Sequence, residues 1–285
     1  MAPVLALLLA FAGSPAAAEA PARVVSMNLC TDQLALMLAA PGQLVSVSHW
    51  ASDPRSSNLV DRAAGLTTNR AGAEQIFLLQ PDLVLAGSFT NRVGVDMLRR
   101  LGIRVEKFPA ARSFDDIPVL IARMGTLLGR EAEAEALIAG FRADLAVLAA
   151  APGGARPEAA YHYPNNYTSG ADTLAADVLA AAGFANAAER LGYRGARRLA
   201  LETLVMAQPF LVRTRPISGG SVGRSYETAA HPALRRLAER GGAVVAERWQ
   251  VCGTPFVLHA VRALAEARRA AAASARQSQQ PRDVD

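Results

Sequence analysis

Apolar residues of the first 112 positions fall into short continuous runs separated by helically spaced stretches. The runs at residues 22–29, 43–49, 81–87 and 103–108 are typical of strands covered on both faces. Residues 31–40, 72–79 and 93–102 show helical spacing, with Thr31 or Asp32 as the expected N-cap of the first helix. This alternation predicts a parallel sheet with helices on both faces.

Residues 113–150 lack strand-like runs and keep a helical spacing of apolar positions throughout. Ser113 and Asp116 have the spacing of a capping box, and residues 131–150 are rich in Ala, Leu and Glu. As one helix, that second stretch is about 30 Å long. We expect this segment to form a rigid helical spine between two α/β halves.

The alternation then resumes, with strands expected at residues 158–163, 209–214 and 243–247 and helices at 171–183, 200–208, 231–242 and 254–274. The predicted fold class is therefore α/β, with two Rossmann-like lobes, a long rigid helix and a ligand cleft between the lobes. The expected organisation is a signal peptide at 1–18, an N-terminal lobe at 22–112, a helical segment at 113–150, a C-terminal lobe at 156–272 and a disordered tail at 273–285.

One sequence unit occurs in both halves. Glu74 is followed by Pro81 and an apolar run, and Glu202 is followed at the same spacing by Pro209 and an apolar run. Two lobes of like construction account for this repetition.

Composition narrows the class of protein. The chain has 285 residues, is 51% hydrophobic and 19% charged, and has a formal net charge of +5. These values are typical of a globular protein. The arginines are scattered and form no dense block with interleaved aromatics, which argues against nucleic-acid binding.

The first twenty residues predict export. Residues 4–13 form an apolar stretch of secretory length, and Ala16, Ala17 and Ala18 supply a cleavage site, although no positively charged n-region precedes them. A buried N-terminal helix is the alternative. No other stretch has transmembrane length, and no Cys lies near the cleavage site to carry a lipid anchor. We expect a soluble periplasmic protein.

Cys30 and Cys252 are the two cysteines of the chain. In an oxidising compartment such a pair forms a disulfide, which would staple the lobes across one end of the cleft. The sequence leaves a second state open, in which both remain thiols that ligate metal.

In an open α/β sheet, ligands bind beyond the carboxyl ends of the strands. The expected cleft residues are Asn28, Cys30, His49, Trp50, Ser88, Phe89, Tyr161, His162, Tyr163, Tyr167, Arg213, Arg215 and Trp249. Ring side chains crowd residues 161–167 and suit a large flat ligand, such as a corrin or porphyrin, or a bulky chelate. Strand alternation sends about half of those rings into the core.

Three details of this cleft stay open in the sequence. Arg213 and Arg215 either face an anionic ligand group or are solvated at a strand edge. One tryptophan lies in each lobe, and either Trp50 or Trp249 can instead be a core residue. No metal-ligand spacing joins the His and Cys residues, so no metal site is predicted, although His49, His162, Tyr163 or Cys30 is placed for an axial contact to a bound iron or cobalt.

Several segments resemble the helical-backbone periplasmic binding proteins of ABC importers for cobalamin, ferric siderophores and haem. They are "RVVSMNLCTDQLALML", "EQIFLLQPDLVLAGS", "LLGREAEAEALI", "GFANAAERLG" and "LETLVMAQPFLV", and the resemblance runs from residue 23 to residue 269. It implies two Rossmann-like lobes joined by one rigid helix. It also implies that Glu74 and Glu202 dock onto arginines of the membrane permease, against the alternative that each only complements a helix dipole. Phe210 occupies the position that Asp82 has in the first unit, so the second unit matches the repeated pattern less closely.

The resulting expectation is a monomeric binding protein that captures cobalamin or a related corrinoid, delivers it to an ABC permease, and has no catalytic residue and no resident cofactor. A ferric siderophore or haem is the alternative cargo. An enzyme on the same architecture is the rival, but the chain lacks G-x-G-x-x-G after its first strand and a Walker loop. A protein that carries a chelate but docks onto no permease is a third possibility, and it would have no role for Glu74 and Glu202.

Overall fold

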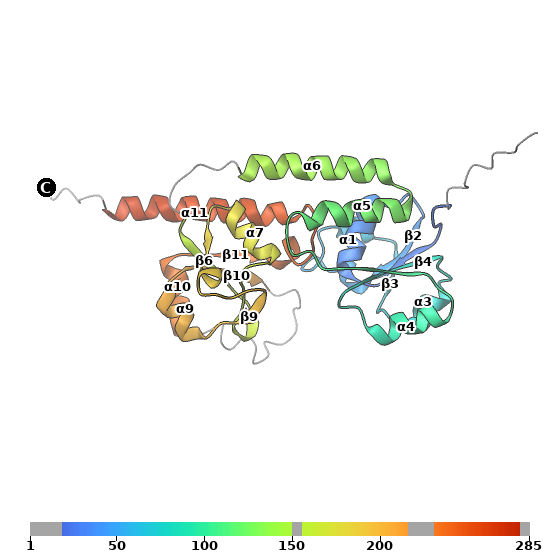
Figure 1. Ribbon diagram of the computed structural model, residues 1–285, viewed down its shortest axis with the longest axis horizontal. Helices are drawn as coiled ribbons and strands as arrows, with labels where there is room; N and C mark the ends of the chain where they lie inside the picture. Colours follow the sequence, from blue (N-terminus) through green and yellow to red (C-terminus); the bar gives the residue numbers. More distant parts are fainter. Residues whose placement is uncertain (1–18, 150–155, 216–230, 280–285) are drawn as a thin grey trace, which may run out of the picture.

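The computed structural model describes residues 19–149, 156–215 and 231–279. Two α/β lobes lie side by side and share a layer of long helices along one face (Figure 1). The α/β class and the two-lobed arrangement predicted from the sequence are confirmed. The expected signal peptide at 1–18 lies outside the described residues.

The N-terminal lobe has a five-stranded sheet in the order β3-β2-β1-β4-β5, and every pairing is parallel. Its strands are β1 (Val24–Ser26), β2 (Leu44–Ser48), β3 (Thr67–Asn69), β4 (Leu83–Gly87) and β5 (Val105–Phe108). Its helices are α1 (Leu29–Leu38), α2 (Val60–Ala63), α3 (Ala73–Leu78) and α4 (Arg92–Arg100). The strand β3 escaped prediction because it is short and polar.

The start of α1 differs from the sequence prediction. Asn28 is the N-cap, and its side chain accepts a hydrogen bond from the Cys30 amide at 3.0 Å. Thr31 and Asp32, the predicted caps, lie within the first turn of the helix and are buried. The Thr31 hydroxyl bonds to the Ser26 hydroxyl and the Asn28 carbonyl, and the Asp32 carboxylate accepts from Ser48, so the polar pattern that resembled a cap is a buried network.

The C-terminal lobe has a parallel four-stranded sheet in the order β11-β10-β6-β8, together with an antiparallel pair of β7 and β9. The strands are β6 (Glu158–His162), β7 (Tyr167–Ser169), β8 (Ala185–Asn186), β9 (Ala196–Arg198), β10 (Phe210–Arg215) and β11 (Gly242–Ala246). The helices are α7 (Leu174–Ala181), α8 (Ala187–Arg190), α9 (Leu201–Ala207) and α10 (Pro232–Arg240).

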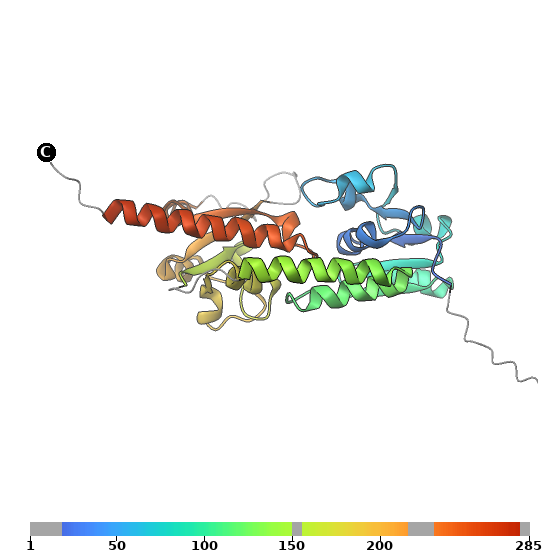
Figure 2. The ribbon, with the colours of Figure 1, turned by 90° about the horizontal axis from the view of Figure 1, so that it is seen from above.

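Three longer helices form the shared layer: α5 (Asp116–Leu128), α6 (Glu131–Ala149) and α11 (Val257–Gln279). Seen from above, α6 crosses the junction between the lobes and α11 runs beside it (Figure 2). The capping box before α5 is confirmed, because the Ser113 amide donates to the Asp116 carboxylate and the Asp116 amide donates to the Ser113 hydroxyl. The helix α11 continues to Gln279, where a disordered tail was expected from residue 273. Its last turns hold Ala, Arg, Gln and Ser with neither Gly nor Pro, so nothing stops the helix earlier.

The hydrophobic core is shared on one face and divided on the other. One cluster runs through both lobes beneath α1, α5, α6, α7 and α11, from Val24 in β1 to Tyr161 in β6 and Val261 in α11. The opposite face of each sheet has its own cluster, under α3 and α4 in one lobe and under α9 and α10 in the other. The helical side therefore holds the lobes together, and the other side does not.

Candidate functional site

A cavity of about 710 Å³ lies between the lobes, at the carboxyl ends of the parallel strands. This volume is within the range of roughly 300–1,000 Å³ common for ligand sites. Its wall is formed by Met27, Asn28, Leu29, Ser48, His49, Trp50, Arg70, Ala71, Phe89, Thr90, Asn91, Tyr163, Pro164, Tyr167 and Glu247.

Six of the residues expected in the cleft line this cavity. The N-terminal lobe contributes Asn28, His49, Trp50 and Phe89, and the C-terminal lobe contributes Tyr163 and Tyr167. Two more, Cys30 and Ser88, line a smaller adjoining cavity. Aromatic side chains therefore face the space from both lobes, and Phe89 is 89% exposed at its edge.

The ring cluster of the C-terminal lobe is split between the core and the cavity, as predicted in number, although alternation does not make the split, because the consecutive β6 residues Tyr161 and His162 are both buried. Tyr161 is fully buried and donates a hydrogen bond to the Gln250 side chain at 2.7 Å. Tyr163 stacks on Tyr161 with ring centroids 5.4 Å apart and turns its other side toward the cavity. Burial raises the pKa of both phenols, so Tyr163 stays protonated and is poorly suited to bind a metal ion as a phenolate.

Three further predicted cleft residues, His162, Arg213 and Trp249, are not among the residues that line the main cavity. His162 is buried, its Nε2 lies 2.9 Å from the Asn166 side chain, and burial lowers its pKa. Trp249 packs against the shared core and lies beside His259. Arg213 pairs with His162 across the β6–β10 ladder, and its Nε is buried. The side chain of Arg215 lies outside the described residues.

His49 and Trp50 reach the cavity because β2 ends directly before a short 3-10 helix, His49–Ser52. The buried carboxylate of Asp32 fixes this junction, accepting hydrogen bonds from the Ser48 amide at 3.0 Å and from the Ser48 hydroxyl. Burial raises the pKa of Asp32 to about 7. The His49 and Trp50 rings lie 4.5 Å apart, and His49 Nδ1 is buried with no hydrogen-bond partner among the described residues.

Sequence reasoning missed several polar wall residues. Arg70 follows β3, the strand that was not predicted, and Thr90 and Asn91 follow the predicted end of β4 by only a few residues. Glu247 lies just beyond β11 and could have been found by the same strand-end rule. The described part of the wall therefore carries one guanidinium, one carboxylate and several neutral amides and hydroxyls.

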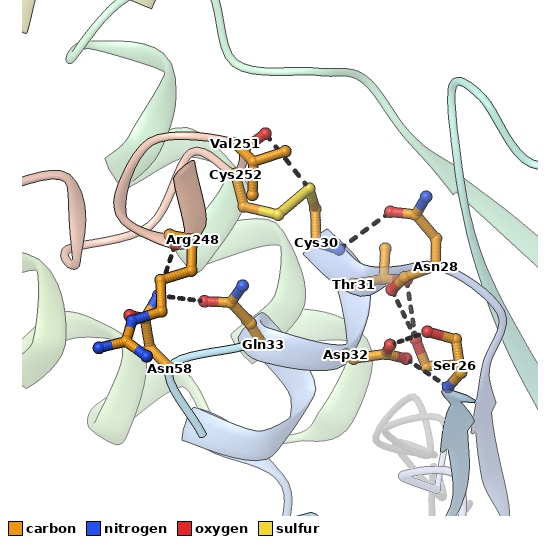
Figure 3. The surroundings of a disulfide bond; sticks show 11 residues. Ser26, Asn28, Cys30, Thr31, Asp32, Gln33, Asn58, Arg248, Val251 and Cys252 are labelled. Carbon is orange, nitrogen blue, oxygen red and sulfur yellow. Dashed lines mark hydrogen bonds between the residues drawn. A yellow bond between two sulfur atoms is a disulfide. The ribbon is translucent and has the colours of Figure 1, made fainter. Parts of the chain in front are cut away.

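A disulfide joins the two lobes beside this cavity (Figure 3). Cys30 lies in the first turn of α1 and Cys252 lies in the loop before α11, with Cα atoms 5.1 Å apart. Both thiols are therefore consumed, which removes Cys30 as an axial ligand. Hydrogen bonds across the same junction join Asn58 to the Arg248 carbonyl at 2.6 Å and the Arg248 guanidinium to the Pro54 carbonyl at 2.6 Å.

Neither of the two repeated glutamates is among the residues that line the cavity. Glu74 is in the first turn of α3 and Glu202 is in the first turn of α9, and both are exposed. The two helices lie on the same face of the molecule, one on each lobe, opposite α6 and α11 (Figure 1). In each unit the glutamine before proline, Gln80 or Gln208, adopts a left-handed conformation, so the backbone repeats as closely as the sequence does.

Within the described ranges, no group of three or more His, Cys, Asp or Glu side chains is placed to hold a metal ion. No helix there has the length and apolar character needed to cross a membrane.

Two α/β lobes fixed by long helices around an aromatic-walled cavity define a ligand-binding protein that encloses its ligand between lobes. Residues 24–216 match the family model described as periplasmic binding protein. The chain belongs to this family, whose members are the substrate-binding proteins of ABC importers. It is 31% identical over 214 residues to the cobalamin-binding protein of Halobacterium salinarum, covering 74% of this chain and 57% of that relative. The match thus spans little more than half the length of the curated relative.

Solved structures share the fold. The apo periplasmic haem-binding protein RhuT from Roseiflexus sp. RS-1 superposes with a TM-score of 0.70 at 23% identity, over 88% of this chain and 98% of that one. The periplasmic vitamin B12 binding protein BtuF of Vibrio cholerae superposes with a TM-score of 0.64 at 19% identity, over 88% and 98% of the two chains. A Fe3+-hydroxamate transport protein from Saccharomonospora viridis gives 0.68 at 22% identity, over 87% and 93%.

Proposed function

We propose that this chain captures cobalamin or a related corrinoid between its lobes and delivers it to an ABC permease. The observation that carries the proposal is the cavity between the lobes, where Trp50 and Phe89 face the space from one side and Tyr163 and Tyr167 from the other. Large flat ligands bind well between aromatic faces. The cobalamin-binding relatives from Halobacterium salinarum support the same cargo.

The polar part of the wall favours a corrinoid over haem. Among the described residues of the wall, Arg70 carries the one guanidinium and Glu247 the one carboxylate, and Asn28, Thr90 and Asn91 add neutral groups. A corrin ring carries neutral amides around its edge, which match neutral donors and acceptors. Haem carries two carboxylates, which would call for more cationic groups than the described part of this wall provides.

Haem or a ferric siderophore is the second candidate cargo. The observation in its favour is His49, which lines the cavity and whose Nδ1 has no hydrogen-bond partner within the described ranges. A neutral imidazole is a common iron ligand, so His49 is the axial candidate that best fits this site. His162 is hydrogen-bonded to Asn166, and the Cys30 sulfur is part of the disulfide, so neither is free to bind a metal ion.

We also propose that Glu74 and Glu202 are the docking points for the permease. Both are exposed, and each lies at the start of a short helix on the same face of its lobe. Two carboxylates fixed on two lobes would steer a partner that presents two cationic groups at the matching spacing. Export to the periplasm through residues 1–18 belongs to the same proposal, and the disulfide is consistent with an oxidising compartment.

The test is isothermal titration of the purified chain from residue 19 onward with cyanocobalamin, haemin and a panel of ferric siderophores. The proposal predicts one-to-one binding of cyanocobalamin with a dissociation constant of about 1 μM or below, equivalent to about 8 kcal/mol of binding free energy. Tighter binding of haemin, with a shifted visible band that His49→Ala abolishes, would favour the second cargo. The absence of binding to every ligand of the panel would overturn both candidate cargoes.

A further inference from the structure

Each of the two repeated glutamates has an exposed apolar side chain four residues later in the same helix. Glu74 is followed by Leu78 at the end of α3, and Glu202 is followed by Met206 near the end of α9. Leu78 is 72% exposed and Met206 is 83% exposed. Side chains at positions i and i+4 are neighbours on a helix surface. Each lobe therefore presents a carboxylate and an apolar side chain next to each other.

Packing of the helices does not explain these apolar residues. Ile76 and Leu204, two residues after each glutamate, are buried in the core clusters under α3 and α9. Neither Leu78 nor Met206 belongs to a core cluster of the described residues. One exposed apolar side chain is ordinary on a protein surface. The same exposed position filled with a large apolar residue in both lobes indicates a contact that the isolated chain does not make.

In the N-terminal lobe the exposed apolar surface extends over α4. Val93, Met97 and Leu101 are spaced by four residues, so they lie along one side of this helix and its C-cap, and all three are exposed. The helices α3 and α4 lie next to each other on the side of the molecule away from α6 and α11 (Figure 1). Exposed apolar surface that spans two helices is typical of an interaction site.

The corresponding helix of the C-terminal lobe differs. α10 exposes three arginines, Arg235, Arg236 and Arg240, where α4 exposes apolar side chains. The contact that both lobes share is therefore limited to one carboxylate and one apolar side chain on each of α3 and α9.

The partner that fits this shared pattern is the permease. The chain belongs to a family of substrate-binding proteins of ABC importers, so the permease is the partner that its family provides. A surface that meets both lobes at once needs two cationic groups opposite the two carboxylates. The apolar side chain beside each carboxylate adds a second requirement, which is an apolar pocket beside each cationic group.

We propose that Leu78 and Met206 insert into apolar pockets of the permease, beside the cationic side chains that pair with Glu74 and Glu202. The proposal deepens the proposed function and rests on it for the docking role of the glutamates. Exposed ion pairs steer the approach of a partner, add little affinity and weaken with salt. Burial of a Leu or Met side chain adds affinity that salt does not screen. The glutamates thus guide the protein onto the permease, and the apolar side chains hold it there.

The test uses right-side-out membrane vesicles from cells that produce this protein, because such vesicles keep the permease and lose soluble binding proteins. Binding of the fluorescently labelled, oxidised protein is measured by co-sedimentation at low and at high NaCl concentration. Liposomes made from the extracted lipids give the background. Wild type should bind the vesicles saturably and should not bind the liposomes.

Two double variants separate the two kinds of contact. Leu78→Ser with Met206→Ser should weaken vesicle binding at least about tenfold and leave its salt dependence unchanged. Glu74→Gln with Glu202→Gln should instead remove most of the salt dependence. The exchange Leu78→Met with Met206→Leu keeps the apolar character and nearly the volume of both side chains, so it should bind within about threefold of wild type.

The matched control is Val119→Ser with Val147→Ser, at exposed apolar positions of α5 and α6 on the opposite face. It should leave vesicle binding unchanged, and every variant should bind cyanocobalamin like wild type, since none of these residues lines the cavity. An equal loss in this control would overturn the proposal, because the loss would then be nonspecific. Equal binding of wild type to liposomes would overturn it as well, because lipid would then be the partner.

Failure of this contact and failure of the proposed function give different results. Wild-type vesicle binding by the Leu78→Ser and Met206→Ser variant would overturn the apolar contact, and a lost salt dependence in the glutamine variant would leave the glutamate docking intact. The reverse pair of results would retain the apolar contact and overturn the role of the glutamates. Absence of cyanocobalamin binding in calorimetry, with vesicle binding as predicted, would overturn the cargo alone.

Discussion

Single residues position the main cavity through buried hydrogen bonds. Asp32 lies beneath the cavity wall and holds the Ser48 amide and hydroxyl, which sets the direction in which His49 and Trp50 leave β2. A carboxylate so deeply buried is costly to ionise, and its pKa is accordingly raised to about 7. The side chain that aims the binding residues therefore titrates near neutral pH.

Asp32→Asn should change how stability depends on pH. In the unfolded chain this carboxyl ionises near its ordinary pKa of 3.8, whereas in the folded protein it stays protonated up to about pH 7. At low pH the Asp32 carboxyl is protonated in both states and costs no stability. The unfolding free energy of wild type should fall as pH rises from about 4 to about 7 and should then level off. Asn keeps both hydrogen bonds of the protonated form, so its advantage over wild type should grow by about 2–3 kcal/mol between pH 5 and pH 8.

Urea unfolding of the oxidised protein at several pH values measures this effect. Asp61→Asn, at an exposed carboxylate of α2, is the matched control and should leave the pH profile unchanged. Parallel profiles for wild type and Asp32→Asn would show that Asp32 ionises normally in the folded state.

The ring residues show how far a sequence can place a site. Strand alternation predicted that about half of the rings at 161–167 face the cleft, and Tyr163 and Tyr167 do so while Tyr161 and His162 are buried. Alternation does not account for this split, because Tyr161 and His162 are consecutive residues of β6 and both are buried, whereas Tyr163 and Tyr167 follow the end of that strand. The roles of Arg70 and Asp32 at the site could not be predicted from the sequence either. Arg70 follows a strand that was not predicted, and Asp32 has the sequence position of a helix cap.

At the scale of elements, the repeated helix–Pro–strand unit was readable from sequence, and its one departure has a structural reason. Asp82 accepts hydrogen bonds from the Ala22 and Arg23 amides and so fixes the chain that enters β1. Phe210 occupies the matching position in the second lobe and packs on Phe184, with ring centroids 5.0 Å apart. The short polar strands β3, β7 and β9 were missed because their pairing, and not their pattern, makes them strands.

The contact between α5 and α6 depends on a missing side chain. A Cβ at Gly125 of α5 would lie 2.5 Å from the Ala134 Cβ of α6, whereas a Cβ at Gly140 of α6 would meet nothing within 4 Å. Gly125→Ala should therefore destabilise the protein by about 1–3 kcal/mol through overpacking. Gly140→Ala should stabilise it by roughly 0.5–1 kcal/mol, because glycine is a poor residue inside a helix.

Denaturant unfolding of the two alanine variants separates these effects, since both make the same chemical change in neighbouring helices. A Gly125→Ala protein as stable as Gly140→Ala would mean that α5 and α6 do not approach each other as the structure has them.

At the scale of the whole molecule, both lobes share one core on the helical side and are cross-linked by the disulfide near the cavity. The Cys30–Cys252 bond closes a loop with a sequence separation of 222 residues. Replacing both cysteines, as Cys30→Ser with Cys252→Ser, should cost about 2–5 kcal/mol of unfolding free energy, because the open unfolded chain has more conformational freedom. Urea unfolding against the oxidised wild type measures this loss, and equal midpoints would contradict it.

The docking proposal also belongs to this scale, because it needs both lobes at once. Glu74→Arg with Glu202→Arg should leave cyanocobalamin affinity within about twofold of wild type, since neither side chain lines the cavity, yet reduce uptake through the permease more than about tenfold. Glu135→Arg, at an exposed position on the opposite face in α6, is the matched control. Unimpaired uptake by the double variant would favour a carrier that works without a permease.

The central claim is that a metal chelate binds in the aromatic cavity between the lobes. The most direct test is the affinity for cyanocobalamin, measured by titration calorimetry for wild type, Trp50→Ala and Trp249→Ala. Trp50 lines the cavity, so its loss should weaken binding by about tenfold, whereas folded Trp249→Ala, which changes a core residue, should bind within about threefold of wild type. Undiminished binding by Trp50→Ala, or no binding by wild type, would contradict the account.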